Sequence, residues 1–165
     1  MTAVSDTTCI NYLALIGELE TLPRLFGQVV IPSAVLQELR HPRSPPVVAQ
    51  CVAKPPSWLS SRRLVAPVDS SLLYLERGER EAIALAEELR ADWLILDEDA
   101  GRREALGRNL PVTGTVGVLV AAADRDLVDL PQAVARLRQT SFRIRGSILD
   151  SALRRDAERR KQADR

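Results

Sequence analysis

Residues 93–97 read Trp-Leu-Ile-Leu-Asp, an apolar run that ends on a carboxylate. Such an uninterrupted run is typical of a strand that is buried on both faces of a parallel sheet. Shorter runs predict strands at residues 2–4, 28–31 and 110–113, and residues 62–65 are a candidate edge strand. We therefore expect a short, mainly parallel central sheet.

Segments with helical spacing of apolar residues alternate with these strands. The proline-rich stretch 41–58 is expected to be a surface excursion and not a domain boundary. Strands that alternate with helices favour a three-layer α/β/α fold, with helices on both faces of the sheet. The expected helices are residues 11–16, 34–40, 47–52, 78–89, 99–107 and 117–125, followed beyond residue 129 by helices only, at 131–138 and 147–161.

Length and composition fit one domain, because 165 residues with 45% hydrophobic content suffice for a single packed core. The sequence has no run of about 18 uncharged apolar residues, and its start lacks the basic and apolar stretches of a signal peptide. We therefore expect a cytoplasmic protein with no membrane contact. The two cysteines, Cys9 and Cys51, form no CxxC pair, and both are expected to be reduced.

The net charge of +1 conceals an asymmetry. From Pro131 to the C-terminus there are 10 basic and 4 acidic residues, a net of +6, and the remainder has 13 basic and 18 acidic residues, a net of −5. An acidic body can concentrate cations, and a basic tail can meet phosphate or an acidic partner. A solvated amphipathic helix explains the tail equally well.

Two aspartates directly follow predicted strands, where ligands gather in sheets of this class. Asp6 follows the first strand and Asp97 follows the strand at 93–96. Glu38 lies in the helix after the second strand, and Glu79 lies in the first turn of the helix before Asp97's strand. Four carboxylates side by side repel one another unless a cation lies between them. Oxygen ligands without His or Cys suit Mg²⁺ or Mn²⁺, so the pattern predicts an acidic metal site.

Each carboxylate also has a purely structural interpretation. Asp6 could cap the first helix, and Glu79 could be a favourable charge at a helix N-terminus. Asp97 could form a turn, and Glu38 could be a solvated helical residue. The prediction of a site therefore rests on the whole set of acids, which come from distant segments.

Five segments carry a family pattern when they are taken in order. They are residues 4–8 (VSDTT), 30–39 (VIPSAVLQEL), 78–86 (GEREAIALA), 94–98 (LILDE) and 112–119 (VTGTVGVL). Together they cover about the first 125 residues and resemble the PIN-domain nucleases, in particular short prokaryotic proteins similar to VapC-type toxins of toxin–antitoxin pairs. No single segment is specific, but the ordered series is.

The resemblance implies a PIN-like fold with a short parallel sheet and a helical C-terminal extension. Residues 1–130 would form the catalytic domain, and residues 131–165 would be a basic helical extension that packs on it or projects from it. The same resemblance makes Asp6, Glu38, Glu79 and Asp97 the metal ligands and catalytic acids.

Two positions of the implied site differ from the family pattern or are ambiguous. The third acid is commonly Asp in the toxins and is Glu79 here, and Glu81 competes for that position. Cys9 and Ile10 replace the small or proline-containing sequence that often follows the first motif. The resemblance further implies substrate contacts from Thr7, Thr8, Arg102 and Thr115.

The implied activity is that of a divalent-metal-dependent endoribonuclease, in which water attacks phosphorus in line and the product keeps a 5′-phosphate. The expected substrate is single-stranded or looped RNA, and with aromatic residues at only 4% we find no stacking motif for sequence-specific recognition. The basic tail and four arginines are candidates for holding phosphate: Arg62, Arg63, Arg102 and Arg103.

A protein partner is the other expectation that the resemblance brings. A toxin would be held inactive by an antitoxin segment over its cleft, and PIN domains often form homodimers. Leu149 and Leu153 could then belong to an interface instead of the core. The main alternative to an enzyme is a PIN-like binding or regulatory module that acts through a protein partner.

Two other hydrolase classes fit the sequence poorly. A phosphatase with an aspartyl nucleophile would need a second Asp two residues after Asp6, where Thr8 stands. A Ser-His-Asp hydrolase would need a nucleophile elbow, and the one histidine, His41, lies in a proline-rich loop without such an elbow.

Overall fold

The computed structural model describes residues 1–143 and 146–164. Within these residues, the centre of the molecule is a five-stranded sheet with the strand order β3-β2-β1-β4-β5. All four neighbouring pairs of strands are parallel, which confirms the expected α/β class. The strands are β1 (Thr2–Ser5), β2 (Gln28–Pro32), β3 (Leu59–Arg62), β4 (Trp93–Ile95) and β5 (Val112–Thr113).

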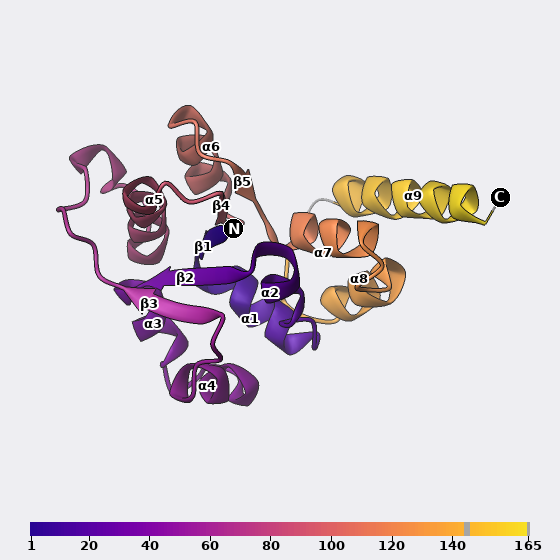
Figure 1. Cartoon of the computed structure of the whole chain (residues 1–165), viewed down its shortest axis with the longest axis horizontal. Coiled ribbons are helices and arrows are strands. Elements are labelled where there is room, and N and C mark those ends of the chain that lie inside the picture. Colours follow the sequence, from indigo (N-terminus) through magenta and orange to yellow (C-terminus); the bar gives the residue numbers. More distant parts are fainter. Residues whose placement is uncertain (144–145, 165) are drawn as a thin grey trace.

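Helices cover both faces of this sheet (Figure 1). α5 and α6 lie on one face, and α1 to α4 with α7 and α8 lie toward the other. In the described part of the chain, no helix combines the length and the apolar character needed to cross a membrane. The helices are α1 (Thr7–Leu15), α2 (Thr21–Phe26), α3 (Ser33–Leu39), α4 (Pro46–Ala53), the 3₁₀ turn η1 (Ser70–Leu72), α5 (Arg77–Leu89), α6 (Asp99–Gly107), α7 (Thr115–Asp124), α8 (Leu130–Arg138) and α9 (Gly146–Ala163).

The central strands are buried on both faces because successive side chains point to opposite sides. In β1, Ala3 packs into the core below α1 and α7, and Val4 packs into the second core below α5 and α6. Both residues are fully buried. This double burial explains the uninterrupted apolar run of β4 and the consecutive apolar residues Ala3 and Val4 in β1.

The order of the strands creates a switch point between β1 and β4. The chain moves outward from β1 to β2 and β3, then returns to place β4 on the other side of β1. The ladder between them continues past β1, because the Asp6 N–H donates to the Ile95 carbonyl at 3.1 Å. Crevices at such a switch point are the usual ligand sites of open α/β sheets.

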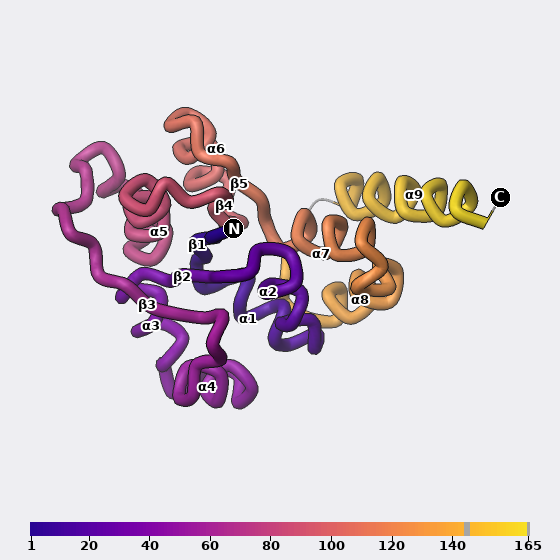
Figure 2. The backbone as a smooth tube through the Cα atoms, in the orientation of Figure 1, coloured from indigo at the N-terminus to yellow at the C-terminus, as the bar shows by residue number. Residues whose placement is uncertain are grey.

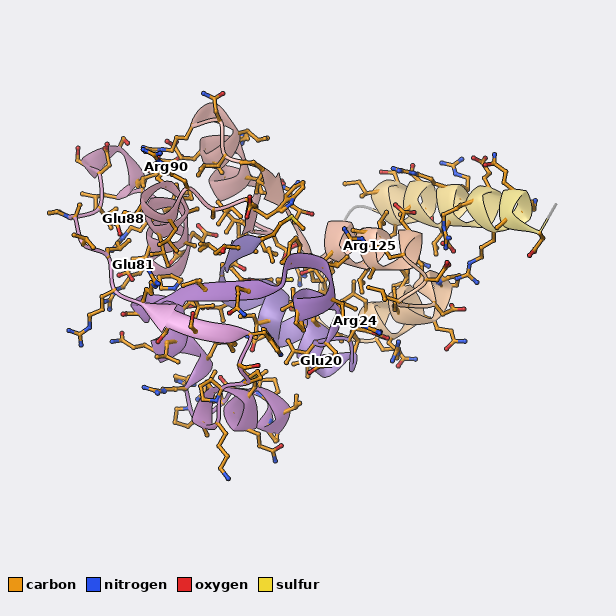
Figure 3. All side chains as sticks on the ribbon, in the orientation of Figure 1. Glu20, Arg24, Glu81, Glu88, Arg90 and Arg125 are labelled. Atoms are coloured by element: carbon orange, nitrogen blue, oxygen red, sulfur yellow. The ribbon has the colours of Figure 1, made fainter. Side chains whose placement is uncertain are left out.

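The structure corrects the position of the edge strand expected at residues 62–65. The strand is β3, and Leu59 is its buried residue, aligned with Val29 of β2. Val65 is 94% exposed. Its N–H donates to the carboxylate of Glu88 in α5, and Glu88 is labelled in Figure 3. The apolar pair at 64–65 therefore marked a tethered loop and not a strand.

One helix was not expected from the sequence. α2 contains Pro23 near its start, where proline is tolerated because the first N–H groups of a helix have no partner within it. Its buried residues Leu22 and Leu25 join the core that contains α1. The proline-rich excursion is likewise part of the fold, since α4 buries Val48 and Val52 in that core.

The C-terminal helix α9 packs beside α7 and α8 and then runs away from the sheet (Figure 2). Leu149 is 4% exposed and belongs to the main core, and Leu153 packs partly buried against it. The expectation that these leucines form an interface instead of core is therefore wrong for Leu149. Its burial anchors the first turn of α9.

We predict that Leu149→Ala destabilises the protein by about 2–5 kcal/mol, because it removes buried methyl groups and leaves a cavity. For a chain of this length, each kcal/mol lowers the melting temperature by about 2–4 °C, which thermal denaturation measures. Ile148→Ala is the matched control because Ile148 is 49% exposed, and its effect is expected to stay within about 0.5 kcal/mol. Equal effects of the two changes would contradict the anchoring role.

Candidate active site

Two carboxylates occupy the switch point. Asp6 ends β1 and stands at the N-cap of α1, although its side chain makes no capping hydrogen bond. After β4, the Leu96 N–H still donates to the Thr113 carbonyl at 2.8 Å. Asp97 is the next residue. The positions expected for both aspartates at strand ends are therefore the positions that they occupy.

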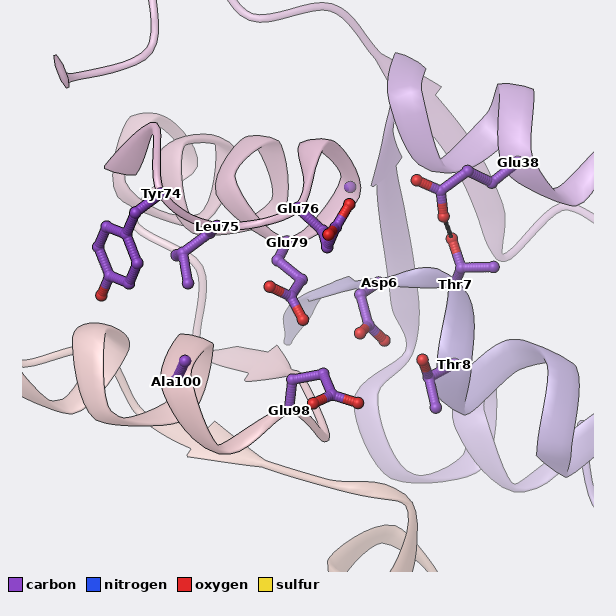
Figure 4. A pocket seen from close by; sticks show the side chains of 11 residues that line it. Asp6, Thr7, Thr8, Glu38, Tyr74, Leu75, Glu76, Glu79, Glu98 and Ala100 are labelled. Atoms are coloured by element: carbon purple, nitrogen blue, oxygen red, sulfur yellow. Dashed lines mark hydrogen bonds between the residues drawn. The ribbon is translucent and has the colours of Figure 1, made fainter. Parts of the chain in front are cut away.

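A cavity of about 540 Å³ opens at this end of the sheet, and residues from four segments line it. Figure 4 shows Asp6 at its centre, with the Glu79 carboxylate on one side and Thr8 on the other. The wall farthest from Glu38 is apolar and carries Tyr74 and Leu75. The carboxylates that line the cavity are Asp6, Glu38, Glu76, Glu79 and Glu98, and the remaining lining residues are Thr7, Thr8, Tyr74, Leu75, Gly78 and Ala100.

The structure distinguishes the two candidates for the third acid. Glu79 lines the cavity and is 9% exposed. Glu81 turns away toward α3, where it accepts a hydrogen bond from the Ala34 N–H at 3.1 Å and pairs with Arg77 at 3.1 Å. Of these two acids, only Glu79 lines the cavity.

Glu38 reaches the cavity from α3 because α5 makes room for it. A Cβ on Gly78 would lie 2.7 Å from the Glu38 Oε1 atom, so a larger residue at this position would displace the carboxylate. Thr7 donates its hydroxyl hydrogen bond to the other oxygen of Glu38 (Figure 4). Thr7 therefore orients an acid, whereas Thr8 lines the cavity beside Asp6.

Asp97 does not line this cavity but lines the larger groove that adjoins it. The Thr115 N–H donates to Asp97 Oδ1 at 2.8 Å, and the Thr115 hydroxyl donates to Oδ2 at 2.7 Å. A Cβ on Gly114 would lie 2.7 Å from Asp97 Oδ1, so this close approach requires glycine. Thr115 is fully buried, which corrects its expected role as a substrate contact. It positions Asp97 instead.

Among the acids of the site, Asp6 has the pKa that is raised furthest above its ordinary value. Its side chain is 3% exposed, and within the described residues its Oδ1 atom has no hydrogen-bond partner. Burial is the main cause that raises the pKa of Asp6 well above its ordinary value, and the charges on Asp97 and Glu79 raise it further. The backbone amides of Cys9 and Thr8 oppose that rise.

Two neighbouring acids are perturbed in the same direction. Burial raises the pKa of Glu79, and the charge on Glu98 adds to the rise. Burial also raises the pKa of Asp97, although the hydrogen bonds from Thr115 lower it in part. Three clustered carboxylates with raised pKa values are the arrangement that a bound cation would relieve.

The donor set fits a hard divalent cation in its chemistry. Asp6, Glu79 and Glu38 offer only oxygen ligands, and among the described residues one oxygen of Asp6 has no hydrogen-bond partner. In residues 1–143 and 146–164, no three His, Cys, Asp or Glu side chains stand close enough to hold an ion as they are placed. The expected four-acid cluster is therefore assembled in part: Asp6, Glu38 and Glu79 share a cavity, and Asp97 lines the adjoining groove.

A larger groove of about 1580 Å³ adjoins the cavity, and Thr8 and Glu98 line both. Arg102 and Arg103 line this groove. One N–H of Arg102 donates to the Leu96 carbonyl at 3.0 Å, so this side chain is partly used to support the end of β4. Arg103 is exposed in the groove.

Other basic residues expected to meet phosphate lie elsewhere. Arg62 and Arg63 are exposed at and after the end of β3, and they line neither the cavity nor the groove. In α9, Arg159 pairs with Asp126 at 3.1 Å, and Arg160 pairs with Asp156 at 2.9 Å. Part of the positive charge of the tail is thus neutralised within the protein.

Several lining residues were missed by sequence reasoning. Tyr74 and Glu76 lie in the segment before α5, which has no helical or strand period that would fix their direction. Phe142 lines the groove and packs edge-on against Tyr12, with ring centroids 4.9 Å apart. In the sequence, only Gly78 and the nearby acid Glu76 pointed to this part of the site.

Comparison with known proteins agrees with this architecture. Residues 2–158 match a family model described as a PIN domain. The match spans nearly the whole chain, so the protein belongs to the PIN-domain family. PIN domains are generally nucleases and typically use divalent metals. The family resemblance expected from the five sequence segments is thereby confirmed.

A solved structure shows the same fold. A PilT N-terminus domain protein, SSO1118 from the hyperthermophilic archaeon Sulfolobus solfataricus P2, superposes with a TM-score of 0.57 and 19% sequence identity. The superposition covers 74% of this chain and 93% of the archaeal chain. No curated protein matches the sequence. At this identity, the archaeal structure supports the fold and not a particular activity.

We predict that Asp6→Asn stabilises the protein at pH 7.5 when divalent ions are chelated. The raised pKa means that folded Asp6 binds its proton more tightly than unfolded Asp6, so stability falls as pH rises from about 3.9 through the raised folded value. The asparagine variant avoids this loss, and its advantage in melting temperature should shrink as the pH is lowered.

Asp150→Asn is the matched control for this change, since Asp150 is 63% exposed in an ion pair with Arg138. Exposed pairs contribute about 0–1 kcal/mol, so no gain in melting temperature is expected. A lower melting temperature for Asp6→Asn than for the unmodified protein at pH 7.5 in chelator would contradict the strain that we assign to Asp6.

Thr115→Val should lower the free energy of unfolding by about 1.5–3 kcal/mol, because it removes a buried hydrogen bond to the charged Asp97 without changing side-chain shape much. Urea denaturation measures this change. Thr115→Ser keeps the hydroxyl and should recover most of the loss. If serine and valine were equally destabilising, the packing of the threonine methyl group and not the hydrogen bond would be the cause.

Proposed function

We propose that this protein is a divalent-metal-dependent endoribonuclease that hydrolyses phosphodiester bonds. The observation that carries the proposal is that Asp6, which lines a cavity together with Glu38 and Glu79, has a buried Oδ1 atom without a hydrogen-bond partner among the described residues. Burying a carboxylate oxygen without a hydrogen-bond partner, close to other carboxylates, costs free energy unless a cation coordinates that oxygen. Membership of the PIN-domain family makes nuclease chemistry the natural use of that cation.

Asp6, Glu79 and Glu38 would hold Mg²⁺ or Mn²⁺, and Asp97 would contribute from the adjoining groove. When bound, such an ion supplies a Lewis acid that activates water and stabilises the charge developing on phosphate. Thr115 fixes the Asp97 carboxylate through two hydrogen bonds, which limits how far that carboxylate can turn. Hydrolysis in this geometry is proposed to leave a 5′-phosphate on the product.

The substrate that we propose is single-stranded or looped RNA. The groove beside the cavity can receive a strand, and Thr8 and Glu98 mark where groove and cavity join. Arg103 and Arg143 are exposed along the groove and can contact phosphates, with Arg102 nearer the acids. Single strands suit a site in which the reacting phosphate must enter between carboxylates.

A second candidate is a PIN-like binding or regulatory module that acts through a protein partner. The observation that favours it is that, within the described residues, no three acids are placed to hold an ion without moving. A toxin role, with an antitoxin segment over the groove, and a homodimer are proposals of the same kind. Light scattering of the purified protein, alone and with the product of a small neighbouring reading frame, tests both assemblies.

The decisive experiment is cleavage of a mixed RNA pool by purified protein with Mn²⁺, with Mg²⁺ and with chelator. We expect cleavage with metal, none with chelator, and a loss of about a hundredfold or more in Asp6→Asn. The products should become substrates for an exonuclease that requires a 5′-phosphate.

Asp92→Asn is the control for this experiment, because Asp92 is exposed before β4, at the opposite end of the strand from Asp97. It should cleave at the rate of the unmodified protein. Cleavage that survives chelation, or that is equal in Asp6→Asn, would overturn the metal mechanism. Bound Mn²⁺ without cleavage of any RNA would favour the binding module.

A further inference from the structure

The acidic cavity has a second, chemically different wall. Tyr74, Leu75 and Ala100 line the end that is farthest from Glu38, and the Glu79 carboxylate lies between this wall and Asp6 (Figure 4). None of the residues that line the cavity is basic. This wall therefore offers apolar contact to a neutral, flat group, whereas it offers a phosphate no basic lining side chain.

Tyr74 is too exposed to be explained as part of the core. Its side chain is 65% exposed and belongs to neither hydrophobic cluster of the described residues. Large exposed aromatic rings beside a cavity offer an apolar face whose burial is favourable only when a ligand covers it.

The ring is nevertheless held in place. The Tyr74 hydroxyl donates to Glu104 Oε2 at 2.9 Å, and the other oxygen of Glu104 accepts from Arg108 Nε at 2.9 Å. Arg108 in turn donates to Glu87 at 3.1 Å and to Ser71 at 2.6 Å. This network ties the tyrosine to α5, α6 and the η1 turn, so the tyrosine side chain loses little conformational entropy when a ligand stacks on it.

We propose that Tyr74, Leu75 and Ala100 form a subsite for one unpaired nucleobase, next to the phosphodiester that the acids would act on. The proposal rests on the nuclease function above and extends it to the way in which the substrate is held. The whole cavity, at about 540 Å³, lies within the range of small-molecule sites, about 300–1,000 Å³. The ring of Tyr74 supplies the stacking face, and Leu75 and Ala100 supply apolar contacts.

The subsite also gives the enzyme a reason to select single strands. A base stacked on Tyr74 must leave its own helix, which costs least in a strand that is already unpaired. Stacking tolerates any base, because every base has a π face. We therefore expect a preference for unpaired positions without a strong preference for sequence.

The test measures binding by fluorescence anisotropy of an eight-nucleotide oligouridylate, with Ca²⁺ in place of Mg²⁺. The same chain with abasic sites throughout is the second probe. We expect Tyr74→Ala to weaken binding of the oligouridylate about tenfold or more and to leave binding of the abasic chain within about twofold. Tyr74→Phe keeps the ring and should stay within about threefold of the unmodified protein.

Leu73→Ala is the matched control, since Leu73 is 57% exposed next to Tyr74 but does not line the cavity. It should bind both probes as the unmodified protein does. Equal effects of Tyr74→Ala and Leu73→Ala would overturn the subsite, and so would a loss in Tyr74→Ala that is the same for both probes. Absence of any binding of oligouridylate to the unmodified protein would overturn it as well.

The outcomes separate the subsite from the nuclease proposal. RNA cleavage without a base-dependent effect of Tyr74→Ala removes the subsite and leaves the nuclease. A base-dependent effect without cleavage of any RNA removes the nuclease and leaves a nucleobase-binding site. In active protein, Tyr74→Ala should raise KM about tenfold for RNA with bases and change kcat little, because stacking is lost equally from bound substrate and transition state.

Discussion

The Asp6 carboxylate lies where the central strand gives way to the first helix, almost fully removed from water and close to two further carboxylates. Hydration cannot relieve this charge, and one of its oxygens has no partner in the described residues. A proton or a cation is therefore needed to complete the site. Two hydrogen bonds hold neighbouring acids in place: the Thr7 hydroxyl donates to Glu38, and the Thr115 hydroxyl donates to Asp97. They keep these carboxylates near Asp6 despite their mutual repulsion.

Helix N-termini explain how the fold tolerates these acids. Asp6 stands at the start of α1, Glu98 at the start of α6, and Asp97 accepts from the first N–H of α7. Glu38 lies against the first turn of α5, where Gly78 leaves it room. The positive ends of four helices thus converge on the carboxyl edge of the sheet, and each offsets part of the negative charge. The order of strands and helices produces this convergence, so the fold and the site have one origin.

The sequence was sufficient for strands β1, β2, β4 and β5 and for the two aspartates that follow β1 and β4, because buried parallel strands appear as apolar runs that stop at a polar residue. It could not separate Glu79 from Glu81, since the direction of a helical side chain depends on how α5 is rotated against the sheet. Thr115 was expected to contact substrate, because its burial results from the packing of α7, which the local sequence does not reveal. Tyr74 was missed because its segment has no period, and β3 was misplaced because a tethered loop contains apolar residues.

The paired arginines of α9 have a consequence for how nucleic acid would be held. Arg159 and Arg160 are neutralised by Asp126, Asp129 and Asp156, so they have little charge to offer a phosphate backbone. Each contact between a basic side chain and a phosphate makes binding to a single strand weaken as salt is added. The logarithm of the binding constant falls by about 0.7 per contact for each tenfold rise in salt concentration. The salt dependence would then be set by the arginines that line the groove, Arg102, Arg103 and Arg143, with a slope of about 2 if all three contact phosphates. High salt would also screen the exposed ion pairs that α9 makes with α7 and with the start and end of α8, which leaves the buried Leu149 as its main attachment.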